Sequence, residues 1–357
     1  MITEIKLVNF KGFKSLVLHD LKRISLVSGK NNIGKSSLLD AFFLLLAHQS
    51  SEVFLKLASF RAVSYATPIE LWESLFYNKD TKNPFQIEFK YDDGTQAKIE
   101  YVRAKNIAFM NEIKAPADVL SSLKDAIRNN YSLQFVFTHD KYREDGYSIV
   151  SSSTILNKIK TNNSNNTLEK MPFAIYINSL MMAIDGATVA WLGKIETNNL
   201  KKVLINALQL LDPSVIDIVT LSMGGPAQLY IKTKNTMLPF FLAGDGLKRL
   251  LYLVSVIIAH PNTLLLVDEV ENGFHYSMYV QIWKLLSQLA IQYNCQLIVT
   301  THSYENINSA LKGIEMAGAE NDFCYYRLGS NRNHSVEGFR STPEVLRTAL
   351  ATNLEVR

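Results

Sequence analysis

GKNNIGKS, at residues 29–36, lies between the apolar run ISLVS and the apolar run LLDAFFLLLA. Glycine and asparagine are poor formers of strands and of helices, so a ligand is the best reason for placing them there. Gly29, Gly34, Lys35 and Ser36 fill every fixed position of the pattern G-x-x-x-x-G-K-[ST]. The apolar run before the stretch predicts a buried strand, and a helix is expected from Lys35 onward.

This pattern predicts a loop that binds nucleotide phosphates. Gly29 and Gly34 allow backbone angles that are closed to other residues, so successive N–H groups can point inward at phosphate oxygens. The helix that starts at Lys35 adds its positive N-terminal end. We expect Lys35 to reach the β- and γ-phosphates and the Ser36 hydroxyl to ligate Mg²⁺. The strand before and the helix after the loop argue against a chance match.

Two adjacent carboxylates, Asp268 and Glu269, follow the apolar run LLLV. Adjacent carboxylates at a strand end are usually solvated surface groups. Here the strand is apolar throughout, and buried parallel strands open at their carboxyl ends on the ligand crevice of the sheet. We therefore expect Asp268 to hold Mg²⁺, directly or through water. Glu269 is expected to orient and deprotonate the attacking water.

Two further motifs lie near these carboxylates in the sequence. His302 follows the apolar strand LIVTT, one strand after the carboxylate pair, where it is placed to contact the γ-phosphate and sense its loss. A lone histidine after a strand is more often structural, but this position favours the functional interpretation. Gly244 and Gly246 open a helix whose free N–H groups would form a second anion site. That site makes sense if it caps a nucleotide held by a second subunit; the alternative is an N-cap without ligand.

The composition bounds the class of protein. The 357 residues are 47% hydrophobic and 20% charged, which is ordinary for a soluble globular protein. The net charge of +4 permits a nucleic-acid partner but does not require one. Cys295 and Cys324 form no CxxC metal site and argue for a reducing cytosol. We find no secretory signal and no apolar run of the roughly 20 residues that a membrane helix needs, so a cytoplasmic location without membrane partner is expected.

Strands alternate with helices between residues 240 and 302, which predicts a parallel sheet with crossover helices. Short strands are also predicted within residues 2–29, and a hairpin with an Asp93-Gly94 turn follows later. We expect the N-terminal and C-terminal strands to share one sheet. Residues 105–170, polar and irregular for most of their length, are interpreted as a helical insertion with a mobile loop. The prediction is an α/β fold, a P-loop NTPase in one domain over residues 1–357, with a mixed N-terminal sheet and a parallel core sheet.

These four elements, in this order and spacing, resemble the ABC-like ATPase heads of the SMC and OLD (overcoming lysogenization defect) group. The chain is similar to the stand-alone AAA-family ATPases of that group. ITEIKLVNFKGFKS and the phosphate loop look like their N-terminus. GDGLKRLL stands where the family has its signature motif, VDEVENGFHYS resembles its Walker B and D-loop, and THS corresponds to its switch histidine. The resemblance is strong over about residues 1–50 and 240–305.

The resemblance implies a role for each matching residue. Nucleotide and Mg²⁺ would be bound by Gly29, Asn31, Asn32, Gly34, Lys35, Ser36 and Ser37, with Asp268 as the Walker B ligand, Glu269 as the base and His302 as the switch. Gly244, Gly246 and Lys248 would act in trans on the nucleotide of a partner subunit. Ala243 stands where ABC signatures usually have serine, and this removes a hydroxyl donor to the γ-phosphate. The implied cofactors are ATP and Mg²⁺, and the implied assembly is a homodimer or higher oligomer with composite sites.

The leading interpretation is a Mg²⁺-dependent ATPase that acts as a nucleotide-driven dimeric switch. The chain lacks the heptads of the long SMC coiled coil, and the segment after His302 lacks the Glu and Asp-x-Asp of a Toprim nuclease. We therefore expect a separate effector, a nuclease or toxin, in anti-phage or genome-maintenance function, with duplex DNA as a further candidate partner. One alternative is an ATP-binding scaffold or sensor with little hydrolysis. Another is a transporter motor, which the absence of membrane spans disfavours.

Overall fold

The computed structural model describes residues 1–50, 53–60, 68–103, 132–150, 155–161, 171–178, 186–222, 228–331, 335–352 and 354–356. The chain divides into two compact units whose segments alternate along the sequence. The first unit contains Met1–Leu21, Gly29–Ala174 and Arg327–Arg340. The second contains Lys22–Ser28, Ile175–Tyr326 and Ser341–Arg357. The single domain expected over residues 1–357 remains a prediction.

A seven-stranded sheet of order β2-β1-β4-β5-β6-β7-β8 forms the first unit. Its strands are β1 (Ile2–Phe10), β2 (Phe13–Leu18), β4 (Phe85–Tyr91), β5 (Gln96–Arg103), β6 (Ser132–His139), β7 (Tyr142–Val150) and β8 (Ile155–Thr161). Every neighbouring pair is antiparallel. The prediction of a mixed N-terminal sheet is therefore wrong. The predicted Asp93-Gly94 turn is confirmed, because it joins β4 to β5 and Gly94 has φ +84°.

The predicted helical insertion at residues 105–170 is wrong wherever the structure describes this region. Strands β6, β7 and β8 extend the antiparallel sheet instead. Leu133, Phe135 and Phe137 are buried and alternate with partly exposed neighbours, as expected for a half-buried strand. The alternation spans few residues and is flanked by polar segments. The polar composition of the whole region therefore hid the strand pattern in the sequence analysis. The remaining parts of this region, 104–131, 151–154 and 162–170, lie outside the described residues.

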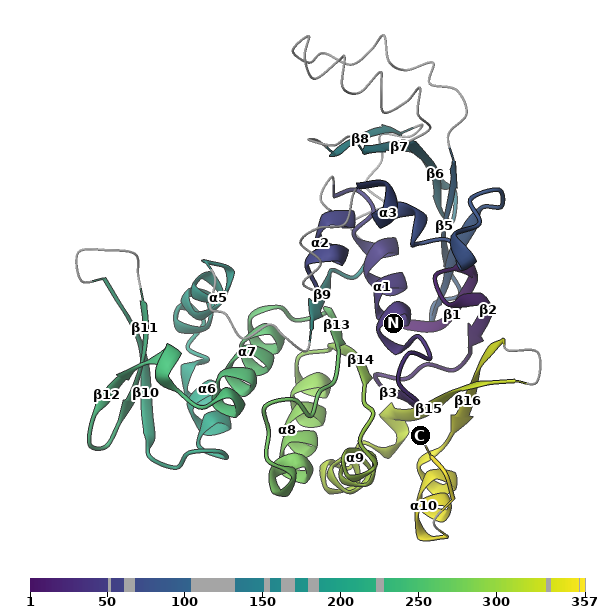
Figure 1. Ribbon diagram of the computed structural model, residues 1–357. Helices are drawn as coiled ribbons and strands as arrows, with labels where there is room; N and C mark the ends of the chain where they lie inside the picture. Colours follow the sequence, from purple (N-terminus) through teal and green to yellow (C-terminus); the bar gives the residue numbers. More distant parts are fainter. Residues whose placement is uncertain are drawn as a thin grey trace. The chain divides into compact units, whose positions relative to one another are not determined.

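Three helices pack on one face of this sheet: α1 (Lys35–Leu46), α2 (Val53–Ser59) and α3 (Pro68–Glu73) (Figure 1). Aromatic pairs make the contact, with ring centroids 5.1 Å apart for Phe42 and Phe89 and 5.9 Å apart for Phe54 and Tyr101. A single turn of 3₁₀-helix, η1 (Tyr77–Lys79), leads into β4. The packing fixes α1, and with it the loop at the start of α1, against the rigid sheet.

The second sheet has the order β16-β15-β3-β14-β13-β9. Its strands are β3 (Ile24–Gly29), β9 (Ala174–Ile177), β13 (Leu264–Val267), β14 (Gln296–Thr300), β15 (Phe323–Ser330) and β16 (Val336–Ser341). β3, β14 and β13 are parallel, with Thr300 opposite Val27 and Val299 opposite Val267. This confirms the predicted parallel core. The N-terminal strands share this sheet only through β3, because β1 and β2 belong to the antiparallel sheet.

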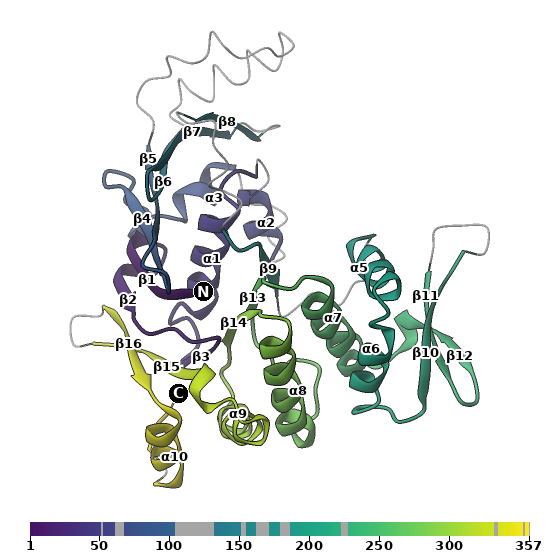
Figure 2. The same cartoon turned by 180° about the vertical axis from the view of Figure 1, so that it is seen from behind.

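Helices α7 (Asp245–Ala259), α8 (Tyr279–Gln292) and α9 (Tyr304–Ala317) belong to the second unit, where α8 lies beside both of the others (Figure 2). The same unit holds α5 (Gly186–Thr197), α6 (Lys201–Leu208) and α10 (Pro343–Ala351). Its small antiparallel sheet consists of β10 (Val215–Leu221), β11 (Gln228–Thr233) and β12 (Met237–Pro239). The remaining 3₁₀ turns are η4 (Phe240–Leu242), η5 (Tyr276–Met278) and η6 (Glu320–Asp322). Within the described residues, every helix is too short or too polar to span a bilayer.

Candidate functional site

The phosphate loop has the local structure that its sequence predicts. β3 ends at Gly29, and α1 begins at Lys35 with Gly34 as its N-cap. Gly29 and Gly34 have φ of +151° and +109°, angles that side chains rarely adopt. A Cβ at Gly34 would also lie 2.7 Å from the ring of Phe13. At Gly29 a Cβ would lie 2.8 Å from the carbonyl oxygen of Leu328. Glycine is therefore required at both positions by backbone angle and by close neighbours.

Lys35 is held inside this loop. Lys35 is 8% exposed, and its Nζ donates to the carbonyl oxygens of Gly29, at 2.7 Å, and Lys30, at 3.1 Å. Ser36 and Ser37 occupy the first turn of α1 and are partly buried, whereas Asn31 and Asn32 are exposed at the top of the loop. An ammonium beside the free N–H groups of a helix start is the environment that a phosphate group requires.

A cavity of about 420 Å³ opens beside the same helix in the first unit. Ser37 of α1 and Lys11 of the β1–β2 turn supply polar groups, and Phe54, Leu57 and Leu71 supply apolar surface. The sequence analysis did not predict this cavity, since its walls come from four separated segments. An apolar pocket with a few polar groups suits a flat, partly polar ligand such as a nucleobase.

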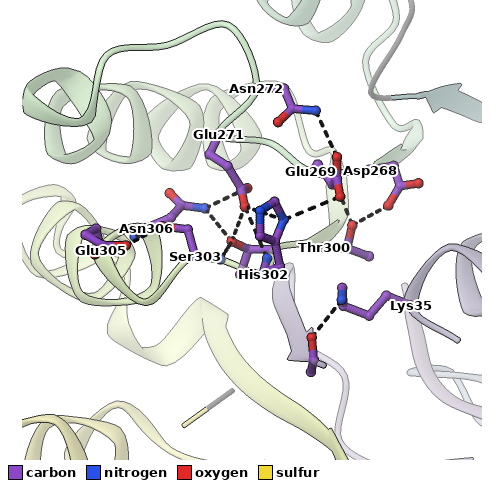
Figure 3. A network of polar contacts seen from close by, with 12 residues as sticks. Lys35, Asp268, Glu269, Glu271, Asn272, Thr300, His302, Ser303, Glu305 and Asn306 are labelled. Carbon is purple, nitrogen blue, oxygen red and sulfur yellow. Dashed lines mark hydrogen bonds and ion pairs between the residues drawn. The ribbon is translucent and has the colours of Figure 1, made fainter. Parts of the chain in front are cut away.

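Asp268 and Glu269 follow the end of β13, as predicted. Asp268 is 8% exposed, and its Oδ1 accepts a hydrogen bond from the hydroxyl of Thr300 at 2.5 Å. The same hydroxyl oxygen accepts from the backbone N–H of Glu269 at 3.0 Å. Thr300, the last residue of β14, therefore orders both carboxylate positions (Figure 3). The sequence analysis missed Thr300, although its place at the end of a strand next to β13 could have indicated it.

Glu269 has a strained backbone and a restrained side chain. Its φ is +47°, in a region that costs a residue with a side chain roughly 1–3 kcal/mol and is often found at active sites. Oε2 accepts from the Asn272 side chain at 2.9 Å, and Oε1 lies 3.4 Å from Nδ1 of His302. The structure thus brings together the predicted base and the predicted switch histidine.

Arg249 of α7 is completely buried and supports the backbone of both carboxylate residues. Its guanidinium donates to the carbonyl oxygens of Asn178 at 2.5 Å, Asp268 at 2.9 Å and Glu269 at 3.4 Å. Burial lowers the pKa of Arg249 to about 10, against the opposing effect of the nearby carboxylates, so the group remains charged at neutral pH. The sequence analysis missed this residue, because its partners are carbonyl groups from distant segments.

The glycine-rich element before α7 contains two different glycines. Gly244 is the N-cap of α7, and a Cβ there would meet nothing within 4 Å. At Gly246 a Cβ would lie 2.7 Å from the carbonyl oxygen of Gly273, so the D-loop of the same chain packs on this residue. Lys248 pairs with Asp245 at 3.2 Å. The trans role predicted for this element remains a prediction.

The donor set suits magnesium better than a transition metal. Among the residues that the structure describes, no group of three or more His, Cys, Asp or Glu side chains could hold a metal ion. Mg²⁺ does not require such a group, because it keeps several waters and is held by one or two protein oxygens together with substrate phosphates. The buried carboxylate of Asp268 is an oxygen donor of this kind.

A P-loop, a parallel core sheet and a carboxylate pair after its buried strand define the class of P-loop NTPases. The family model for the AAA domain, putative AbiEii toxin, Type IV TA system, matches residues 24–308, and the chain belongs to this family. A curated relative, the ATP/GTP phosphatase of Helicobacter pylori, is 27% identical over 351 residues, which cover 91% of this chain and 90% of the relative. The predicted membership in the ABC-like AAA ATPases is confirmed by this family match.

Two solved structures share the fold. The SMC head bound to the C-terminal winged-helix domain of ScpA aligns with a TM-score of 0.51 at 12% identity, over 96% of this chain and 97% of that one. The SMC head with an extended coiled coil, bound to the C-terminal domain of ScpA derived from Pyrococcus furiosus, also aligns with a TM-score of 0.51, at 11% identity over 99% of both chains. At these identities the likeness concerns the fold alone.

Proposed function

We propose that the protein is a Mg²⁺-dependent ATPase whose hydrolysis drives a dimeric switch. The phosphates are bound by the loop residues Gly29, Asn31, Asn32, Gly34, Lys35, Ser36 and Ser37. Ser36 and Asp268 hold Mg²⁺, which neutralises phosphate charge when bound. Glu269 takes the proton of the attacking water, while Asn272 fixes one of its oxygens. The cavity beside Ser37 is the proposed place for the nucleobase.

The observation that carries this proposal is the register of three parallel strands. Thr300, Val27 and the end of β13 lie in one row of the sheet, so β3, β14 and β13 all finish at the same edge. Ser28 precedes the phosphate loop, Asp268 and Glu269 follow β13, and His302 follows β14. In α/β sheets of this kind, ligands bind beyond the carboxyl ends of the strands. Chain connectivity therefore supports one site built from all three motifs.

The proposed switch needs a second subunit. In it, Gly244, Gly246 and Lys248 complete the nucleotide site of the partner in a homodimer or higher oligomer. The free N–H groups at the N-terminus of α7, with open space around Gly244, support this role for the element. The proposed output is control of a separate effector, a nuclease or toxin, in cytoplasmic anti-phage defence or genome maintenance, with weak binding of duplex DNA.

The test compares Lys35→Ala with Glu269→Gln. Lys35→Ala removes the cation of the loop, so ATP binding measured by calorimetry should be lost. Glu269→Gln keeps the shape of the base but cannot take a proton, so ATP should bind, accumulate unhydrolysed and hold a dimer in size-exclusion chromatography. Unchanged ATP affinity in Lys35→Ala would sink the assignment of the loop. Wild-type turnover in Glu269→Gln would show that another group is the base.

A further inference from the structure

Glu271, in the loop after the carboxylate pair, is a buried carboxylate that binds a single distant segment. Its side chain is 6% exposed. Oε1 accepts from the hydroxyl of Thr301 at 2.7 Å and from the backbone N–H of His302 at 3.1 Å, and Oε2 accepts from the side chain of Asn306 at 3.1 Å. Every hydrogen-bond donor in this set comes from the end of β14 or the first turn of α9 (Figure 3).

The segment that Glu271 holds is rigid at its far end as well. Asn306 donates to the Thr301 hydroxyl at 3.1 Å, and its Oδ1 accepts from Nε1 of the buried Trp283 at 2.8 Å. The Ser303 hydroxyl accepts from the backbone N–H of Asn306 at 3.1 Å and so caps α9. His302 lies inside this frame, yet its side chain is 47% exposed. The frame fixes the backbone of His302 and leaves its imidazole accessible.

The imidazole of His302 lies between two carboxylates. Nδ1 is 3.4 Å from Oε1 of Glu271 and 3.4 Å from Oε1 of Glu269, the proposed base. Glu271 therefore contacts His302 twice, at the backbone N–H and at the ring. The other carboxylate oxygen of Glu269 accepts a hydrogen bond from Asn272. The position of the ring relative to Glu269 consequently depends on Glu271.

The donor set explains why this position holds a carboxylate. A buried charge is tolerated when several hydrogen bonds satisfy it, and Glu271 accepts them on both oxygens. In a glutamine at this position, one of the two accepting oxygens would be replaced by an NH₂ group, which can only donate. In one orientation of the amide, this NH₂ group would lie against the NH₂ group of Asn306. In the other orientation it would lie against the donors of Thr301 and His302. A merely packed residue would not need this chemistry.

We propose that Glu271 is a positioning residue for nucleotide hydrolysis, which acts by setting His302 against Glu269. This inference rests on the proposed roles of His302 and Glu269. Glu271 does not touch the reacting atoms. It holds the segment 301–306 so that the imidazole stays beside the base, where a shift of about 1 Å can cost a hundredfold in rate.

The experiment is a double-mutant cycle between Glu271→Gln and His302→Ala, read as kcat and KM for ATP hydrolysis. In the wild-type background, Glu271→Gln should lower kcat about 10- to 100-fold while KM stays within about twofold. In the His302→Ala background the same substitution should change kcat by less than about twofold, because its route to the chemistry is already gone. Glu305→Gln is the matched control, since this exposed carboxylate accepts a hydrogen bond from the Ser303 hydroxyl of the same segment and its substitution should leave kcat unchanged.

Equal losses of kcat in both backgrounds would overturn the inference, because they would show that Glu271 acts independently of His302. Unchanged kcat in Glu271→Gln would overturn it as well. If Glu271→Gln does not fold, Thr301→Val replaces it in the cycle, since it removes one donor to Glu271 at nearly constant shape. The Glu269→Gln variant tests the proposed function separately from this inference. If the proposed function is wrong, Glu269→Gln should hydrolyse ATP at the wild-type rate. If Glu269→Gln is inactive and the cycle is additive, the inference alone is wrong.

Discussion

Arg249 offers a sharp test of how α7 supports the carboxylates. Arg249→Met keeps the length and apolar stem of the side chain but removes the guanidinium. The carbonyl groups of Asn178, Asp268 and Glu269 would then lose their shared donor. We expect lower stability and lower kcat, since the backbone that carries the metal ligand and the base would no longer be held at its strained geometry.

The magnitude follows from the three contacts. Leaving a buried acceptor unsatisfied costs about 1–3 kcal/mol, and the bonds at 2.5 and 2.9 Å count fully while the one at 3.4 Å counts little. Removing a buried charge returns part of this cost. A net loss of about 3 kcal/mol is therefore expected. Displacement of the base by about 1 Å would lower kcat by up to about 100-fold.

Urea unfolding and ATPase kinetics measure both effects. The matched control is Arg347→Met, which removes an exposed arginine paired with Glu315 and should leave the urea midpoint and kcat nearly unchanged. Equal unfolding midpoints for the two variants would refute the argument that Arg249 supports the site. A destabilised Arg249→Met with wild-type kcat would show that the backbone geometry of Glu269 does not depend on it.

Two further outcomes are expected. Burial alone raises the pKa of the fully buried Glu144 carboxyl group, but its contacts with His48 and other neighbours outweigh this effect and lower the pKa below its ordinary value. The ionised carboxylate therefore stabilises the fold above the pKa of the unfolded chain, and this stabilisation is lost as the pH falls through the lower pKa of the folded state. Glu144→Gln should therefore lower the urea midpoint at pH 7 and flatten its fall below pH 4.5; an unchanged acid curve would contradict this. Gly246→Ala should destabilise the fold by about 1–3 kcal/mol, because its methyl group meets the Gly273 carbonyl, whereas Gly244→Ala should cost less than about 1 kcal/mol. Equal unfolding midpoints would refute that distinction.

The motifs whose local structure the sequence predicts depend on neighbouring residues alone. The phosphate loop needs only its own glycines and an apolar strand and helix beside it, so all of its determinants lie within about fifteen residues. The same holds for Asp268, Glu269 and His302, each of which follows an apolar strand. Because buried parallel strands end together at one edge, their order in the sequence was sufficient to predict a parallel core.

The antiparallel sheet of the first unit was harder to predict, although its strands carry the expected alternation. Leu133, Phe135 and Phe137 alternate with less buried residues, but the surrounding region is polar. One of the two pairing partners of β6 is β5, which lies on the other side of residues 104–131 in the sequence. The sequence of either strand alone does not indicate a pairing partner at such a separation. The assignment of β1 and β2 to this sheet, and of β3 to the other, also depends on long-range pairing.

Supporting charges are the residues that sequence patterns locate least well. Arg249 lies in LKRLLYLVSVII, a helix that is apolar around most of its circumference, so its burial could have been predicted. Its partners could not, because they are backbone carbonyls at Asn178, Asp268 and Glu269. Glu271 follows the carboxylate pair by two residues and resembles another surface charge of the loop. Its role emerges only when α9 brings Thr301 and Asn306 to it.

The two glycines before α7 show how the structure narrows a sequence pattern. From the sequence, Gly244 and Gly246 cannot be told apart, because both belong to a helix start that either meets an anion or caps the helix without a ligand. The structure gives Gly246 a reason within its own chain, since the backbone of Gly273 approaches too closely for any side chain. Gly244 has no such neighbour, and its φ of −62° is open to every residue. A glycine that neither packing nor backbone angle demands is best explained by something that approaches from outside the chain. Gly244, and not Gly246, is therefore the position at which a trans contact should be sought.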